Sequence, residues 1–290
     1  MMPDDAHLPA PRRNSEGAIL ADVRDAEAPP CGSATGQDFT RDAFLGNLLW
    51  LRQPRRGYRA GLDAVLLAAS VGAAGEDGTG RMQVADCGAG AGTVGLCIAR
   101  RLPTAEVTLI EREPLYASLA RINAQDNDLA DRVRVVEADL TAPFEAIAGR
   151  GLNSGSYDVV VANPPFHDVG SGTLSGEPLK DGANAMPSGD LETWCRRMAH
   201  LSRPGGIALM VHKADRLAEI LAGMENRFGG LTVLPVHPRE GAAAHRIIVR
   251  GVKGSRAPLT LASGFVVHDS GNAFSPAAEA ILRHGAPLSF

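Results

Sequence analysis

The apolar positions of this chain fall into short runs rich in β-branched residues, separated by longer stretches in which apolar residues recur at helical spacing. Such short runs predict buried strands, and the stretches between them predict helices. Strands that alternate with helices are typical of an α/β protein with a doubly wound, mostly parallel sheet. The predicted strands are centred on Val84 and span 106–110, 133–136, 157–162 and 206–211; the predicted helices span 62–73, 93–101, 114–127, 191–201, 214–227 and 276–283.

Further patterns flank this series. Phe44–Leu51 predicts a short strand or hairpin, and 231–236 with 246–252 predicts the antiparallel pair that closes such a sheet. Residues 167–189 are rich in glycine and show no apolar period. Because long loops in compact domains are often functional, 167–189 is a candidate lid or RNA-binding loop, with simple disorder as the alternative.

A glycine-rich segment follows the first strand. Asp86 ends that strand, and Gly88, Gly90 and Gly92 occupy alternate positions ahead of the next helix. Alternate glycines let a backbone approach a ligand closely, and the following helix N-terminus presents unpaired N–H groups. Glu111 ends the second strand, 23 positions after Gly88, which is close to the spacing at which a carboxylate meets ribose hydroxyls in a nucleotide site.

Two cofactors compete for this loop. Gly90, Gly92 and Gly95 fit the dinucleotide fingerprint, whereas Asp86 followed by alternate glycines fits the loop that binds S-adenosylmethionine. A pyrophosphate requires N–H donors and is repelled by a nearby anion. The ammonium and sulfonium groups of S-adenosylmethionine are instead stabilised by a nearby anion. Asp86 therefore favours the methyl donor. Asp139, which follows the third strand, is placed to accept from the adenine amine.

The fourth strand ends at Asn163-Pro164-Pro165-Phe166. The two prolines lack an N–H group and have a fixed φ, so they predict a rigid, extended turn. This turn holds the Asn163 oxygen and nearby carbonyls as fixed acceptors beside the aromatic face of Phe166. Such a cluster suits a flat group bearing an exocyclic amine. For these four residues alone, a plain tight turn at a strand end is the alternative.

Together these motifs resemble the class I S-adenosylmethionine-dependent methyltransferases that modify an exocyclic amine of a base. The segments Gln53–Leu67 and Ala244–Gly254 are similar to the bacterial tRNA1(Val) adenine-N6 methyltransferases. The resemblance implies a Rossmann-like fold with a mostly parallel seven-stranded sheet, an antiparallel last strand and helices on both faces. It also implies methyl transfer to adenine N6 of tRNA without a metal. The implied catalytic residues are Asn163, Pro164, Pro165 and Phe166, and the implied cofactor-binding residues are Asp86, Gly88, Gly90, Gly92, Glu111 and Asp139.

Other substrates remain open at this stage. Phe166 followed by His167 also resembles the ribosomal RNA guanine-N2 methyltransferases. Protein-glutamine methyltransferases use a similar Asn-Pro-Pro turn on a side-chain amide, and small-molecule methyltransferases are a further alternative.

Acidic residues concentrate at the N-terminus. Residues 1–40 hold seven acids against three arginines, which accounts for the whole net charge of −4. This segment has no clear apolar period, so 1–38 predicts a disordered acidic extension ahead of a single methyltransferase domain over 39–290. Four scattered cysteines, and neither a membrane span nor an export signal, predict a cytoplasmic protein.

Basic residues gather in two places within the remaining chain. Arg55, Arg56, Tyr58 and Arg59 crowd one turn ahead of the first helix and form a candidate RNA-binding site. A second group, Arg239, Arg246, Arg250, Lys253 and Arg256, lies near the C-terminal strands. Both groups are candidates for holding RNA phosphates, with a solvated basic face as the alternative.

Overall fold

A computed structural model describes residues 39–56, 59–72, 81–168, 185–186, 190–269 and 271–290. Contacts group Asp38–Phe290 into one compact unit. The predicted acidic extension lies outside the described residues, and so does most of the predicted lid. Of the latter, only two-residue strands are described, β7 (His167–Asp168) and β8 (Ala185–Met186), which pair in parallel.

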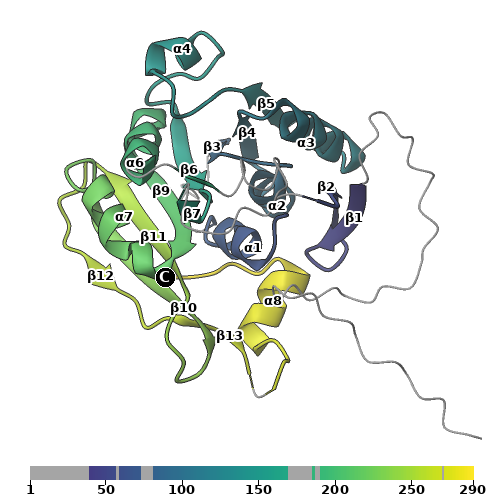
Figure 1. Ribbon diagram of the computed structural model, residues 1–290, viewed down its shortest axis with the longest axis vertical. Helices are drawn as coiled ribbons and strands as arrows, with labels where there is room; N and C mark the ends of the chain where they lie inside the picture. Colours follow the sequence, from purple (N-terminus) through teal and green to yellow (C-terminus); the bar gives the residue numbers. More distant parts are fainter. Residues whose placement is uncertain (1–38, 57–58, 73–80, 169–184, 187–189, 270) are drawn as a thin grey trace, which may run out of the picture. The chain divides into compact units, whose positions relative to one another are not determined.

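The centre of the sheet is parallel. Its strands are dominated by Val, Ile, Leu and Ala that are buried on both faces, as expected where helices cover both sides of a sheet. Across the sheet the parallel strands follow the order β5 (Val133–Glu137), β4 (Ala105–Glu111), β3 (Met82–Cys87), β6 (Tyr157–Ala162) and β9 (Ser202–Lys213), as Figure 1 shows.

An antiparallel strand completes the sheet. β11 (Arg246–Lys253) lies between β9 and β10 (Phe228–Arg239) and runs antiparallel to both. This confirms the predicted Rossmann-like sheet with an antiparallel last strand. Two short strands that the sequence did not predict, β12 (Thr260–Leu261) and β13 (Phe265–His268), pair with β10 in parallel and raise the number of strands from seven to nine.

Helices cover both faces of the sheet because alternate residues of each strand enter two separate hydrophobic cores. On β6, Val159 and Val161 belong to one core and Val160 to the other. The first core includes α1 (Leu62–Ala69), α2 (Thr93–Arg101), α3 (Pro114–Asp126) and α8 (Pro276–His284), and the second includes α6 (Asp190–Leu201) and α7 (Leu217–Met224). A short helix that was not predicted, α4 (Phe144–Ala148), precedes β6.

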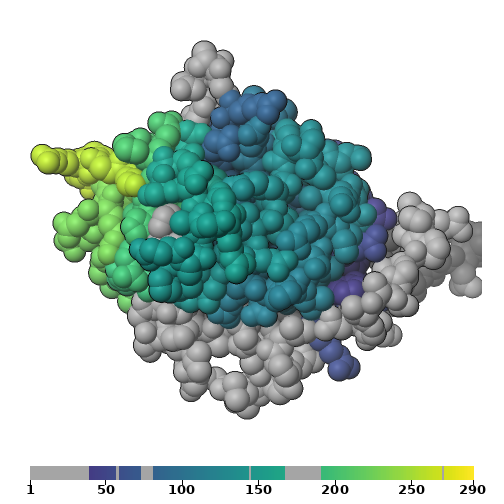
Figure 2. Space-filling model, turned by 90° about the horizontal axis from the view of Figure 1, so that it is seen from above, coloured from purple at the N-terminus to yellow at the C-terminus, as the bar shows by residue number. Residues whose placement is uncertain are grey.

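The carboxyl ends of β3 and β6 flank the position where the strand order reverses. In a doubly wound sheet, ligands bind in the crevice at this switch point. The glycine loop follows β3, and Asn163 follows β6, so the fold places the two main predicted motifs on either side of one crevice. Figure 2 shows a face covered mainly by the teal segment that contains β4, β5 and β6, with the green segment that follows beside it.

An N-terminal hairpin precedes the sheet. β1 (Phe39–Phe44) and β2 (Leu49–Pro54) pair antiparallel. Of the two predicted forms for Phe44–Leu51, a strand or a hairpin, the structure therefore shows the hairpin. The middle of this segment is the turn between β1 and β2. The hairpin extends five residues further toward the N-terminus than predicted, from residue 44 to residue 39.

Side chains of α3 and of the residue that follows it hold the free edge of β2. Asn127 accepts a hydrogen bond from the Trp50 amide (2.9 Å) and donates one to the Trp50 carbonyl (2.7 Å). One turn earlier, Asn123 makes the same exchange with Arg52 (2.8 and 3.1 Å) and also donates to the Ala91 carbonyl (2.9 Å). The two amides thus replace a neighbouring strand and connect the hairpin to the glycine loop.

Asn127→Ala is expected to loosen the hairpin. The change leaves the Trp50 N–H and C=O groups without their partner, so the free energy of unfolding should fall by about 1–3 kcal/mol. Hydrogen exchange should be faster at the Trp50 amide than in the wild type. Gln125→Ala, at an exposed position of the same helix, is the control. Equal exchange at Trp50 in both variants would contradict this role.

Candidate functional site

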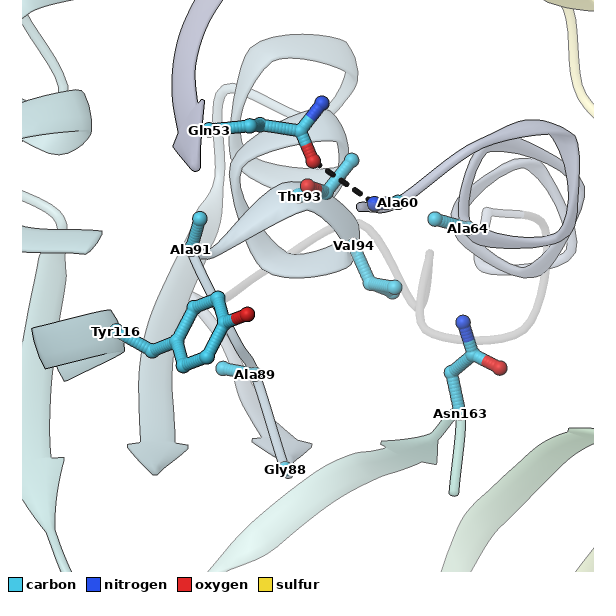
Figure 3. A pocket seen from close by; sticks show the side chains of 10 residues that line it. All are labelled: Gln53, Ala60, Ala64, Gly88, Ala89, Ala91, Thr93, Val94, Tyr116 and Asn163. Atoms are coloured by element: carbon cyan, nitrogen blue, oxygen red, sulfur yellow. Dashed lines mark hydrogen bonds between the residues drawn. The ribbon is translucent and has the colours of Figure 1, made fainter. Parts of the chain in front are cut away.

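A pocket opens between the glycine loop and the end of β6. Gly88, Ala89 and Ala91 line one side of it, and Asn163 lines the other. Figure 3 shows the Tyr116 hydroxyl and the Asn163 amide pointing into the space between these elements. The remaining lining residues are Gln53, Ala60, Ala64, Thr93 and Val94.

The pocket lining fits S-adenosylmethionine. Gly88, Gly90 and Gly92 have φ of 70°, 55° and 92°, a left-handed conformation that favours glycine and leaves the loop backbone open to a ligand. The Thr93 hydroxyl is buried and has no hydrogen-bond partner among the described residues. A buried polar atom in a pocket lining suits a polar ligand that completes its hydrogen bonds.

Two of the predicted cofactor residues brace this loop from behind. The Asp86 carboxylate is 1% exposed and accepts from the Gly95 amide at the start of α2 (2.8 Å). Glu111, also buried, accepts from the amides of Gly90 and Glu113 (both 2.8 Å). Neither residue belongs to the described pocket lining. Direct contact of either carboxylate with the cofactor stays a prediction.

Burial perturbs the titration of Asp86. Desolvation raises the pKa of its carboxyl from 3.8 to about 7, the Gly95 N–H opposes this rise, and the charge of Glu111 adds to it. Burial likewise raises the pKa of Glu111, against the hydrogen bonds from Glu113 and Gly90. Asp86 therefore binds its proton more tightly in the folded chain than in the unfolded chain.

Asp86→Asn is expected to change the pH dependence of stability. In the wild type this carboxyl lowers the free energy of unfolding by up to about 1.4 kcal/mol per pH unit as pH rises from about 4 to about 7, with no further loss above 7. The substituted amide does not titrate and can still accept from Gly95, so that part of the slope should vanish. Urea unfolding at pH 5 and pH 8 measures it, with the exposed Asp131→Asn as control. Parallel wild-type and variant profiles would disprove the shift.

The third predicted acid lies in a loop held by α6. Asp139 Oδ1 accepts from the amide and the hydroxyl of Thr141 (2.8 and 2.7 Å). Arg197, itself buried, donates to the carbonyls of Leu140 (3.0 Å) and Ala142. Arg197 thus fixes the loop that carries Asp139, a role that sequence reasoning missed. Asp139 is partly exposed but not in the described pocket lining.

The turn after β6 contacts β9. Pro164 is buried, and the Pro165 carbonyl accepts from His212 Nε2 at 3.4 Å. The Phe166 ring meets the His212 ring edge to face, with centroids 5.0 Å apart. Burial lowers the pKa of His212 to about 4, so the imidazole is neutral at physiological pH. His212 was not predicted, although it also stands near the carboxyl end of a parallel strand.

The first arginine group lies beside the pocket. Gln53 and Ala60, which flank it, both line the pocket, and Gln53 Oε1 accepts from the Ala60 amide (2.8 Å). Arg59 Nη2 donates to both carboxylate oxygens of Asp42 (2.8 Å). Arg55 and Arg56 are exposed, and Tyr58 lies outside the described residues.

The second basic group is divided by the sheet. Arg246 pairs in register with Lys213 at the carboxyl edge of β9, whereas Lys253 pairs with Phe228 at the opposite edge. There the Lys253 ammonium donates to the carbonyls of Ala199 (2.6 Å) and Ser202 (2.7 Å). The five residues therefore do not form one surface, because β11 is antiparallel and carries them from one edge of the sheet to the other.

The part of the chain that the structure describes holds neither a metal centre nor a membrane span. Among the described residues, no group of three His, Cys, Asp or Glu side chains is arranged to hold a metal ion. Within the same residues, no helix has both the length and the apolar character needed to cross a membrane.

Comparisons with known proteins identify relatives of this chain. The methyltransferase small domain family matches residues 67–189. A tRNA1(Val) (adenine(37)-N6)-methyltransferase of Porphyromonas gingivalis is 32% identical over 56% of this chain, and the match spans 61% of the relative's length. A Shewanella amazonensis enzyme of the same name is 31% identical over 68% of this chain and 79% of its own length.

A solved structure agrees. The crystal structure of a predicted O-methyltransferase from Agrobacterium tumefaciens superposes with a TM-score of 0.65 and 34% identity, covering 79% of this chain and 99% of that one. Fold, motifs and relatives coincide: the chain belongs to the S-adenosylmethionine-dependent methyltransferases, and its relatives include enzymes named tRNA1(Val) (adenine(37)-N6)-methyltransferase.

Proposed function

We propose that this protein transfers a methyl group from S-adenosylmethionine to the N6 amine of an adenine in tRNA, in the cytoplasm, with residues 39–290 as one methyltransferase domain. The observation that carries the proposal is the pocket in which Asn163 faces the glycine loop. This arrangement brings a side-chain amide, suited to an exocyclic amine, to the place where the family binds its methyl donor. The names of two relatives support adenine N6 as the acceptor.

The protein's task is to position and tune the nucleophile. S-adenosylmethionine supplies a methyl group on a strongly electrophilic sulfonium. An adenine amine is a poor nucleophile because its lone pair is delocalised into the ring. In our proposal Asn163 Oδ1 and the Pro164 carbonyl accept its two N–H groups and draw the nitrogen toward a tetrahedral shape, while Phe166 stacks on the base.

Proton removal needs no dedicated base in this proposal. The nitrogen carries an extra proton once it has gained the methyl group, and this acidic ammonium loses that proton to water. His212 is not poised as a base, since it is buried and its Nε2–H is directed to the Pro165 carbonyl. The target adenine must leave its stack to enter the pocket, which costs least in a loop such as the anticodon loop.

Arg55 and Arg56 are the proposed phosphate contacts. Arg55→Gln with Arg56→Gln should weaken tRNA binding and lower the slope of log Kd against log salt by about 1–2. The slope falls because binding releases fewer counterions when phosphate contacts are lost. Filter binding at several salt concentrations measures this. Arg81→Gln, at an exposed position ahead of β3, is the control. An unchanged slope would leave the turn with a structural role.

The proposed reaction is tested by methyl transfer from labelled S-adenosylmethionine into unmodified total tRNA, ribosomal RNA and protein extract, followed by nucleoside analysis. N6-methyladenosine in tRNA is the expected product. N2-methylguanosine in ribosomal RNA would show that the acceptor is the N2 amine of guanine instead of the N6 amine of adenine. Label confined to protein would favour a glutamine side chain as the acceptor, and label in none of the three would favour a small molecule.

A further inference from the structure

The aromatic ring of the Asn-Pro-Pro-Phe turn is held by two residues from neighbouring strands. The Arg246 guanidinium lies over one face of the Phe166 ring, 4.8 Å from its centroid. The His212 ring meets Phe166 at an interplanar angle of 79°. A cation over the face of an aromatic ring and an edge-to-face contact with a second ring are both favourable. They restrict the rotation of Phe166 from two directions.

Arg246 is itself fixed by an acid on α1. Its Nε donates to Asp63 Oδ2 at 2.9 Å, and the two side chains are 31% and 22% exposed. Asp63 lies in the first turn of α1, one residue ahead of Ala64 in the pocket lining. The guanidinium therefore spans from the helix beside the pocket to the aromatic ring of the turn. The negative charge of Asp63 balances the positive charge that the guanidinium places over the ring.

His212 is fixed by its hydrogen bond. The Pro165 carbonyl can only accept, so the proton resides on His212 Nε2 and Nδ1 carries none. The imidazole thus contacts the backbone of the turn and the Phe166 ring at the same time. His212 and Arg246 both lie near the carboxyl edge of the sheet, because Arg246 on β11 is in register with Lys213, the residue that follows His212 on β9.

We propose that Asp63, Arg246 and His212 form a clamp of positioning residues that leaves one face of Phe166 for the acceptor group. This inference rests on the proposed function and assigns to Arg246 a role other than phosphate binding. The clamp fixes the plane in which a flat substrate stacks, and hence the angle at which its amine meets Asn163. Misplacement of the ring should lower turnover rather than RNA affinity, because the phosphate contacts lie elsewhere.

The kinetic test compares Arg246→Lys with Arg246→Gln in the full chain. Lysine keeps the charge but lacks the planar group that covers the ring and pairs with Asp63. We expect both variants to lower kcat about 10- to 100-fold, with the KM for tRNA within about threefold and S-adenosylhomocysteine binding unchanged. Arg283→Gln, which removes an exposed charge on α8, should retain wild-type kcat. A phosphate contact would instead give a near-normal Arg246→Lys and a raised KM in Arg246→Gln, which would overturn the clamp.

A second measurement needs no substrate. In protein with labelled Phe and His, the Phe166 ring resonances, assigned with Phe166→Leu, should shift in Arg246→Gln and not in Arg283→Gln. His212 should show the Nε2–H tautomer. Unshifted Phe166 signals would overturn the clamp whatever the substrate is. If the Phe166 signals shift in Arg246→Gln and the wild-type protein methylates no RNA, the clamp is supported and the proposed function is overturned.

Discussion

Asn163→Ala should lower kcat about 10²- to 10³-fold, comparable to the loss of one polar group that acts on the reacting atoms in other enzymes. The amide oxygen is the proposed acceptor for the substrate amine, and alanine offers no replacement. Binding of S-adenosylhomocysteine should change little, because the glycine loop and its bracing carboxylates are untouched. Single-turnover methyl transfer and calorimetric titration with S-adenosylhomocysteine measure the two quantities separately.

The control for this variant is Asn153→Ala, which removes an exposed amide ahead of β6. It should keep full turnover and full cofactor binding. If Asn163→Ala lost most of its affinity for S-adenosylhomocysteine while the bound complex still reacted at the normal rate, Asn163 would belong to the cofactor site instead of the acceptor site.

Gly88→Ala should weaken the binding of S-adenosylhomocysteine by about 30-fold or more. Gly88 has φ of 70°, and a Cβ there would lie 2.5 Å from Cη2 and 3.2 Å from Cζ3 of the Trp194 indole. Trp194 is itself buried, so the ring has little room to move. The left-handed conformation and the overlap each cost about 1–3 kcal/mol, and every 1.4 kcal/mol is a factor of ten in affinity.

A second substitution separates these two costs. Trp194→Phe removes the outer ring atoms that a Cβ on residue 88 would meet. The double variant should therefore recover the steric part of the loss and retain the conformational part. Calorimetric titration of the wild type, both single variants and the double variant completes the cycle. Strictly additive effects would show that the loss of affinity in Gly88→Ala does not come from overlap with the Trp194 ring.

The sequence predicted the parallel sheet well because each central strand is a short apolar run with a strong pattern of burial. The same reasoning brought Gly88 and Asn163 to one sheet edge, since parallel strands end together. It missed β12 and β13, which have only two and four residues. It also extended a helix over 214–227, where the chain forms a short 3-10 turn and α7 ends at Met224, ahead of Asn226 with φ of 61°.

Residues whose role depends on a distant partner were not predictable from local pattern. Neither Tyr116 nor Trp194 was predicted to be functional, yet Tyr116 lines the pocket and Trp194 packs against Gly88. Asn123 and Asn127 were not predicted to have a role either, yet they form hydrogen bonds with a strand more than 70 positions away. Clustering by sequence position also failed for Arg246 and Lys253, because an extended strand separates them in space.

The ion pairs around the pocket bear on how this protein meets its substrate. Arg52, Arg59 and Arg246 are each paired with an aspartate, so much of the positive charge near the pocket is already compensated. Apart from Arg55 and Arg56, little positive charge then draws a polyanion from a distance, and encounter rates should exceed the roughly 10⁵–10⁶ M⁻¹s⁻¹ typical of unsteered association only modestly at low salt. Discrimination among RNAs would then depend on how long each stays bound, which favours a molecule of the right shape over one that is merely abundant.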